Sequence, residues 1–133
     1  MSDFSGYKLV LTDTLEAGED LTAYRAVKVS SGKLYHTDTQ GEKADGIVLE
    51  DYDSGEAAMY VILGEVPVAI KTAANVAHGD LLTPSDEGAS DAGKLEEAAS
   101  SDYVLARVKE APSADDDVVV VFVNAVSLAP AVA

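Results

Sequence analysis

The stretch from Ala57 to Leu82 most constrains how this chain can fold. Its first part, Ala57 to Leu63, is apolar at every position, which is typical of a short strand covered on both faces. From Glu65 to Lys71 valine and isoleucine alternate with other residues, which predicts a strand with one buried and one open face. Pro67 places that strand near a sheet edge. Gly64 joins the two parts, either in a tight hairpin turn or as a glycine bulge that bends one long strand.

Short strands at short intervals are predicted along the rest of the chain. The expected strands are Tyr7–Thr12, Tyr24–Ser30, Lys33–Thr37, Gly46–Leu49, Leu81–Thr83, Tyr103–Lys109 and Val118–Val123. Turn residues separate them, with a turn region over Thr14–Leu21, a two-residue hairpin connection at Ser31–Gly32 and a long polar loop from Pro84 to Gly93. Because no amphipathic helix of helical length is visible, we predict an all-β fold, a compact antiparallel β-barrel or β-sandwich.

The C-terminal strand and the chain length bound the domain organisation. Val118–Val123 is the most strongly apolar strand, so we predict that it is buried, and the aspartates at 115–117 discourage its edge-to-edge aggregation. A chain of 133 residues is most simply one domain. We expect a polar N-terminal arm over residues 1–6, a single β domain over 7–124 and an apolar C-terminal tail over 125–133.

Two segments share a weak internal similarity. A-G-E-D-L-T-A at Ala17–Ala23 and A-H-G-D-L-L-T at Ala77–Thr83 both place a small residue, glycine, aspartate and leucine near the start of a strand. The pattern indicates that the same turn is used twice. Two short matches do not by themselves establish a repeat.

The formal net charge of −15 restricts the partners of this chain. Phosphate backbones and anionic membranes bind through clusters of lysine and arginine, so we expect neither nucleic acid nor membrane as a partner. The acidity serves either solubility or adaptation to high salt. The chain lacks cysteine, which excludes a disulfide framework, and it lacks a signal peptide and an apolar membrane-spanning run, so we expect a soluble protein made inside a cell.

The chain contains no recognisable catalytic motif, so we predict neither an enzyme nor a cofactor. His36 and His78 with Asp80 are the most metal-like set, but their spacing favours ordinary surface or interface histidines and an aspartate that bonds its own turn. Acidic pairs such as Glu96-Glu97 are better explained as solvated turns. Lys43 between two glycines resembles the displayed lysine of biotinyl and lipoyl carrier domains, although it lacks their flanking apolar strands.

One family resemblance covers nearly the whole chain. The order and spacing of several glycine-punctuated strands, rather than any single motif, are similar to those of the small capsid decoration, or cement, proteins of tailed viruses. The matching segments are Thr14–Val29, Ala44–Leu49, Ser54–Val68, Ala74–Thr83, Asp102–Val108 and the closing apolar strand. The resemblance implies a β-barrel or β-tulip-like fold and a role on the outer surface of the viral head. The implied partners are the major capsid protein and further copies of the chain, commonly in a homotrimer.

The candidate contact residues follow from this resemblance and from the apolar segments. If the chain trimerises, one face of the Ala57–Leu63 strand would contact another subunit, so the candidate oligomer interface comprises Met59, Tyr60, Val61 and Ile62. The two tails are too short to fold alone and could order on a partner, so the candidate capsid contacts are Phe4, Tyr7, Val126 and Leu128. A trimeric β hydrolase of the nucleotide-hydrolase kind, a tail or fibre accessory module and a cellular adhesion module remain alternatives.

Overall fold

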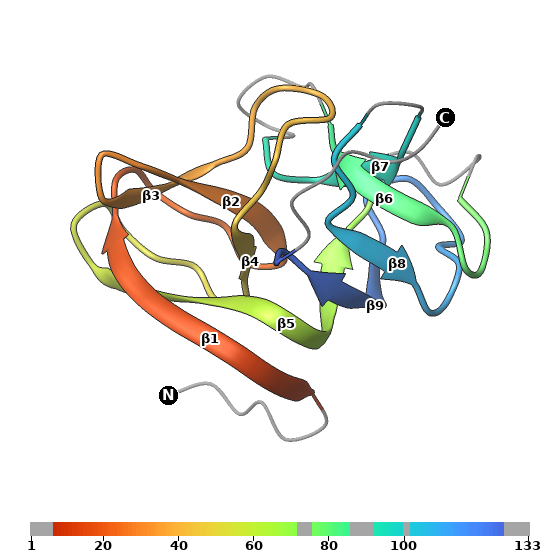
Figure 1. The fold of residues 1–133 in the computed structure, drawn as a ribbon, viewed down its shortest axis with the longest axis horizontal. Helices are drawn as coiled ribbons and strands as arrows, with labels where there is room; N and C mark the ends of the chain where they lie inside the picture. Colours follow the sequence, from red (N-terminus) through yellow and green to blue (C-terminus); the bar gives the residue numbers. More distant parts are fainter. Residues whose placement is uncertain (1–6, 72–75, 86–91, 100–101, 127–133) are drawn as a thin grey trace.

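The protein is described by a computed structural model that covers residues 7–71, 76–85, 92–99 and 102–126. These residues contain strands and no helix, and the predicted all-β class is confirmed. Nine strands form one sheet (Figure 1): β1 (Lys8–Ala17), β2 (Arg25–Ser30), β3 (Lys33–His36), β4 (Gly46–Val48), β5 (Ala57–Ala69), β6 (Leu81–Pro84), β7 (Leu95–Glu97), β8 (Ala106–Val108) and β9 (Val118–Asn124). The described residues therefore contain no helix that could cross a membrane.

The sheet closes on itself twice around β5. Its strand order is β1-β3-β2-β4-β5-β9-β8-β6-β7, and β1 also pairs with β5, which closes a first barrel of β1 to β5. A parallel bridge between Ile70, directly after β5, and Leu95 in β7 closes a second barrel of β5 to β9. Figure 1 shows β1 to β4 at the left and β6 to β9 at the right, with β5 running from one group to the other. The chain is thus two small barrels that share one long strand.

Gly64 is the point at which β5 passes from one barrel to the other. Of the two predicted alternatives, the single bent strand is correct, since β5 runs without a break from Ala57 to Ala69. Gly64 pairs with Leu9 on one side and Val123 on the other, and the pairing with β1 shifts register next to it. Beyond Glu65, β1 has ended, which leaves Pro67 paired with β9 alone and agrees with the predicted edge position.

The two barrels have the same strand connectivity. Strands β1, β2, β3, β4 and β5 of the first barrel correspond in order to β5, β6, β7, β8 and β9 of the second, and every pairing in one has its counterpart in the other. In each barrel, the first and third strands pair in parallel. The other pairings in the sheet are antiparallel, as predicted, and these two closures, where the first strand meets the third rather than its neighbour in sequence, are the parallel exceptions.

Hydrogen bonds repeat along with the strands. The amide of Ala17 donates to the backbone carbonyl of Glu56 at 2.8 Å, and the amide of Ile70 donates to the backbone carbonyl of Asp117 at 2.8 Å. The turns before β5 and β9 both use a left-handed residue, Gly55 with φ of 94° and Asp116 with φ of 67°. The similar segments at 17–23 and 77–83 do not take equivalent places in this repeat, since the first begins at the last residue of β1 and the second ends inside β6. The structural repeat therefore extends over the whole five-stranded unit and is not the one that the weak sequence similarity indicated, because the strand pairings match Ala17 with Ile70 and Ala26 with Leu81.

Two hydrophobic clusters form the core, and strands of the first barrel contribute to both. Val27, Val48 and Tyr60 point into the first barrel and pack with Leu34. The outward-facing residues Ala26, Ile47 and Val61 are fully buried in the cluster that fills the second barrel. The predicted two-sided burial of the first part of β5 is confirmed at Tyr60 and Val61, and the cover on the second face comes from the other barrel.

Three element boundaries differ from the sequence prediction. β1 continues to Ala17 through part of the predicted turn, because its polar residues pair with β5 along an exposed surface. β7 was expected to be a solvated turn, yet its three residues pair with β6. The strand predicted at Tyr103–Lys109 is shorter and forms only Ala106–Val108.

Candidate interaction surface

A row of three side chains crosses the outside of the second barrel. Leu81 in β6 pairs with Arg107 in β8, and Arg107 pairs with Phe122 in β9, so the three residues lie side by side. Leu81 is 45% exposed and Phe122 is 38% exposed. The guanidinium of Arg107 lies 5.1 Å from the centre of the Phe122 ring, in the geometry of a cation–π contact. We call these three residues the Phe122 row.

Grooves extend this surface on both sides of Phe122. One groove of about 410 Å³ runs from Phe122 and Asn124 across β5 to Lys8 and Val10, and the side chain of Val10 is 70% exposed. A second groove of about 250 Å³ runs from Phe122 to Leu81 and Val104. Large apolar side chains that are exposed next to one another usually mark an interaction site.

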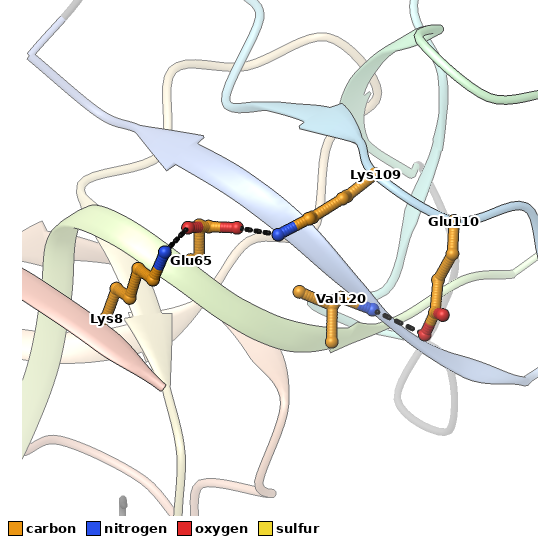
Figure 2. A pocket seen from close by; sticks show the side chains of 5 residues that line it. All are labelled: Lys8, Glu65, Lys109, Glu110 and Val120. Atoms are coloured by element: carbon orange, nitrogen blue, oxygen red, sulfur yellow. Dashed lines mark hydrogen bonds and ion pairs between the residues drawn. The ribbon is translucent and has the colours of Figure 1, made fainter. Parts of the chain in front are cut away.

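Basic residues border the apolar surface. A third groove of about 370 Å³ is lined by Lys8, Glu65, Lys109, Glu110 and Val120, and Figure 2 shows Glu65 between the two lysines. Lys109 pairs with one carboxylate oxygen of Glu65, and Lys8 lies 3.3 Å from the other. The hydrogen bond from Lys109, together with Lys8, lowers the pKa of Glu65 below its ordinary value. Lys109 also lies 5.5 Å from the centre of the Phe122 ring.

The charge of this surface differs from that of the chain as a whole. Lys8, Arg107 and Lys109 are three of only nine basic residues in a chain of net charge −15, and all three adjoin Phe122 or its grooves. An apolar centre with a cationic border suits a protein partner that carries apolar and acidic groups.

The predicted oligomer-interface residues lie on the N-terminal half of β5. Tyr60 and Val61 are buried within the single chain, and the Tyr60 hydroxyl donates to Asp13 at 3.4 Å. Burial raises the pKa of Tyr60 above its ordinary value. Met59 and Ile62 are half-buried, so of the four predicted residues these two keep surface that a second chain can contact.

The predicted capsid-contact residues lie at the two ends of the described domain. Tyr7 is half-buried against the larger hydrophobic cluster, and burial together with a hydrogen bond to Tyr24 raises its pKa. Val126 is 54% exposed, and its amide donates to Asn124. Phe4 and Leu128 lie outside the described residues.

The residues weighed for metal or carrier chemistry have structural partners. His36 is buried, its Nε2 accepts a hydrogen bond from the Thr22 amide at 3.0 Å, and desolvation lowers its pKa. Asp80 accepts from the Ala77 amide in its own turn, as predicted. Lys43 donates to the carbonyl of Ala125 at 2.8 Å and is half-buried, whereas a carrier lysine must extend into solvent. Among the described residues, no group of three or more histidine, aspartate or glutamate side chains could hold a metal.

The acidic run before β9 closes a turn. The carboxylate of Asp117 accepts from the amides of Ser113 and Ala114 and from the Ser113 hydroxyl, which lowers its pKa. Asp116 pairs with Lys94 at 2.7 Å. These contacts give two of the three aspartates a structural role.

Sequence reasoning missed the Phe122 row because it treated β9 as wholly buried. That prediction is wrong, since burial alternates along β9 and leaves Val118 and Phe122 exposed. The available signal was period-two alternation, which places residues 118, 120 and 122 on one face whatever their hydrophobicity. In the structure that face carries the exposed Phe122, which lies opposite Arg107.

Comparison with known proteins gives a likeness in fold. No protein-family model matches the chain, and no curated protein sequence matches it either. Among solved structures, the fold is similar to that of the N base of head fiber gp8.5 of bacteriophage phi29, with a TM-score of 0.61. The aligned residues are 18% identical, and they cover 86% of this chain and 94% of that chain. At this identity the likeness concerns the fold.

Proposed function

We propose that this chain is a non-enzymatic structural protein of a tailed-virus head that binds the outer surface of the capsid and stabilises contacts between major capsid subunits. The observation that carries the proposal is the likeness to the base of a phage head fiber, which extends over nearly the whole of both chains. A match of that extent compares complete folds rather than a shared hairpin. The resemblance of the strand order to decoration proteins supports the same role.

The surface chemistry agrees with a structural role. The residues that most invited a catalytic or carrier role, His36, Asp80 and Lys43, are engaged in bonds that hold the fold together. A chain of net charge −15 would be repelled by the packaged genome, which favours a position outside the shell. We expect a homotrimer on the virion, built in the host cytoplasm before it binds the head.

In this proposal the two tails contact the capsid, and the fold places the points where they join the domain next to each other. Lys8, at the start of β1, pairs with Glu65, and Asn124, at the end of β9, pairs with Leu63. Both tails therefore leave the domain next to the same three residues of β5. A single capsid surface could then order both tails together, with Phe4, Tyr7, Val126 and Leu128 as the apolar anchors.

The test is binding to emptied viral heads. We expect the full chain to co-sediment with heads in a fixed ratio, and chains lacking residues 1–6 or 127–133 to occupy fewer sites, most of all when both are removed. Thermal melts of each truncated protein show whether the domain is intact. Full occupancy by the doubly truncated chain would exclude the tails as capsid contacts, and the absence of any binding by the full chain would exclude the proposed function.

A fibre or tail accessory role is the second candidate, because the similar structure is named as the base of a fiber. The two roles differ in what the chain carries. A decoration protein is complete on the head surface, whereas a fibre base joins a further distal chain. Isolation of virions and their separation into heads and tails would distinguish a head protein from a tail protein, and electron microscopy of the heads would show whether a fibre projects from it.

A further inference from the structure

We propose that a second copy of this chain docks on the Phe122 row, head to tail, through the tip of its β2–β3 hairpin at Ser31–Lys33. The proposed function includes a homo-oligomer, and this inference names the surfaces through which its copies bind each other. It rests on that expected self-association and not on binding to the capsid. The two barrels repeat one fold, and within the chain the outer row of the first barrel already contacts a glycine turn of the second barrel.

The Phe122 row has an exact structural counterpart in the first barrel. Ala26 in β2 pairs with Ile47 in β4, and Ile47 pairs with Val61 in β5, which repeats the pairings of Leu81 with Arg107 and of Arg107 with Phe122. We call Ala26, Ile47 and Val61 the Val61 row. Every residue of the Val61 row has an exposure of 0%, because the second barrel covers it. The Phe122 row is the same surface without its cover.

A glycine turn of the second barrel supplies part of the cover on the Val61 row. The amide of Ala26 donates to the carbonyl of Gly93 at 2.7 Å, and the Gly93 amide donates to the backbone carbonyl of Thr37 at 2.9 Å. Arg25 adds a hydrogen bond from its guanidinium to Ala92 at 3.1 Å. A Cβ atom on Gly93 would lie 2.8 Å from the Ala26 carbonyl oxygen, so the two backbones are in close contact.

The first barrel carries the counterpart of this turn, and there the turn covers nothing. Gly32-Lys33-Leu34 and Gly93-Lys94-Leu95 enter equivalent strands, and both glycines have positive φ, 77° and 84°. A Cβ atom on Gly32 would have nothing within 4 Å. Among the described residues, the Gly32 turn of the first barrel therefore contacts no row, and the Phe122 row of the second barrel is contacted by no turn.

Two unlike surfaces that each lack a partner are what a head-to-tail contact between copies requires. When two unlike surfaces of a repeated unit bind each other, one surface of each kind stays free at the ends of the array, and a second copy can supply the missing partner. Within the chain, β5 connects the two barrels and restricts how they rotate. Separate chains lack that connection, so side-chain contacts set the rotation between copies and a closed ring can form.

Charge supports the same pairing. The Phe122 row contains Arg107 and adjoins Lys109, whereas acidic groups lie beside the β2–β3 hairpin. They are Glu16, which pairs with Lys33 at 3.1 Å, and Asp38 and Glu42, which pair with Lys28 at 2.8 and 2.9 Å. Glu16 and Asp38 keep half or more of their side-chain surface exposed. These carboxylates can approach the cations beside Phe122, and high salt should weaken that attraction.

Cysteine cross-linking tests the contact directly, since the natural chain has no cysteine. Ser31→Cys and Leu81→Cys proteins would be mixed and oxidised, and we expect a disulfide between the two different variants. The matched control is Val118→Cys, because Val118 is 47% exposed on the same strand as Phe122 but lines none of the three grooves. Cross-linking of Ser31→Cys to Val118→Cys as efficiently as to Leu81→Cys would overturn the proposal.

Sedimentation velocity of the full chain over a concentration series gives the second measurement. We expect the natural protein to form oligomers, Phe122→Ser to be monomeric with an unchanged thermal melt, and Val118→Ser to behave as the natural protein does. A monomeric natural protein, or a Phe122→Ser oligomer of unchanged strength, would overturn the proposal. If Phe122→Ser oligomerises normally and loses binding to heads, the row binds the capsid instead, and the proposed function survives without this inference.

Discussion

The two barrels share one connectivity and differ in what covers their outer faces. In the first barrel the Val61 row is closed by the second barrel, and in the second barrel the Phe122 row remains open. The residues have diverged accordingly: the covered row holds Ala26, Ile47 and Val61, while the open row holds Leu81, Arg107 and Phe122. The comparison teaches that the same strand register can serve as core or as surface, depending on whether a neighbour is present.

The largest difference is expected between aspartate substitutions in the two rows. Val61→Asp places a carboxylate in the hydrophobic cluster without a partner, which we expect to cost about 3–5 kcal/mol and to unfold much of the protein. Phe122→Asp keeps the charge at the surface, and we expect a loss of at most about 1 kcal/mol. Urea unfolding followed by circular dichroism measures both. Equal losses would show that the Phe122 row is covered within the single chain.

The two glycine turns give the next largest contrast. Gly93→Ala introduces a methyl group within 2.8 Å of Ala26, Arg25 and His36 atoms at a φ of 84°, so we expect a loss of about 3 kcal/mol. Gly32→Ala meets no neighbour and only the left-handed backbone opposes it, which we expect to cost about 1 kcal/mol. The free energies of unfolding of the two variants, measured at monomeric concentrations, provide the check. A larger loss for Gly32→Ala would contradict the assigned roles of the turns.

His36 makes the contact between the barrels sensitive to pH. Burial lowers its pKa below the ordinary 6.5, so the unfolded chain binds a proton more readily than the folded chain. The stabilisation is complete above pH 6.5 and is lost as the pH falls toward the folded pKa, by at most about 1.4 kcal/mol per pH unit. Thermal melts between pH 7.5 and about pH 5, a range chosen around the histidine pKa, should show this slope. His36→Gln should lower stability at neutral pH and remove most of the slope, and an unchanged slope would assign it to other groups.

The smallest contrast concerns two equivalent lysines. Lys94 pairs with Asp116 while its own side chain is only 11% exposed, and Lys33 pairs with Glu16 in a contact where both side chains are about half exposed. We expect Lys94→Ala to cost about 1 kcal/mol, because it removes buried methylene groups as well as the ion pair. Lys33→Ala should leave the melting temperature of the monomer nearly unchanged, since an exposed pair adds little. A loss for Lys33→Ala in the monomer as large as that for Lys94→Ala would contradict the expected difference between the two ion pairs.

Local patterns predicted most strands because they depend only on nearby residues. The alternation over Arg25–Ser30 and the Ser31–Gly32 turn produced the expected hairpin, and its turn has the positive φ angles that such connections use. The closure of each barrel was not predictable in this way. The parallel pairing of Ala17 with Leu34, and that of Ile70 with Leu95, joins residues far apart in sequence, and three-residue strands such as β7 carry too little pattern of their own.

The candidate surface shows the same limit. Alternation along β9 assigns Phe122 to one face of the strand, but it does not say whether another element packs on that face. Val61 and Phe122 occupy equivalent positions and are both large and apolar, yet one is fully buried and the other is exposed. The sequence by itself determined the all-β class, the strand segments and the acidic surface, since these follow from composition and short-range periodicity. Only the tertiary structure decided which of the two rows is covered, because burial depends on contacts between segments that β5 brings together.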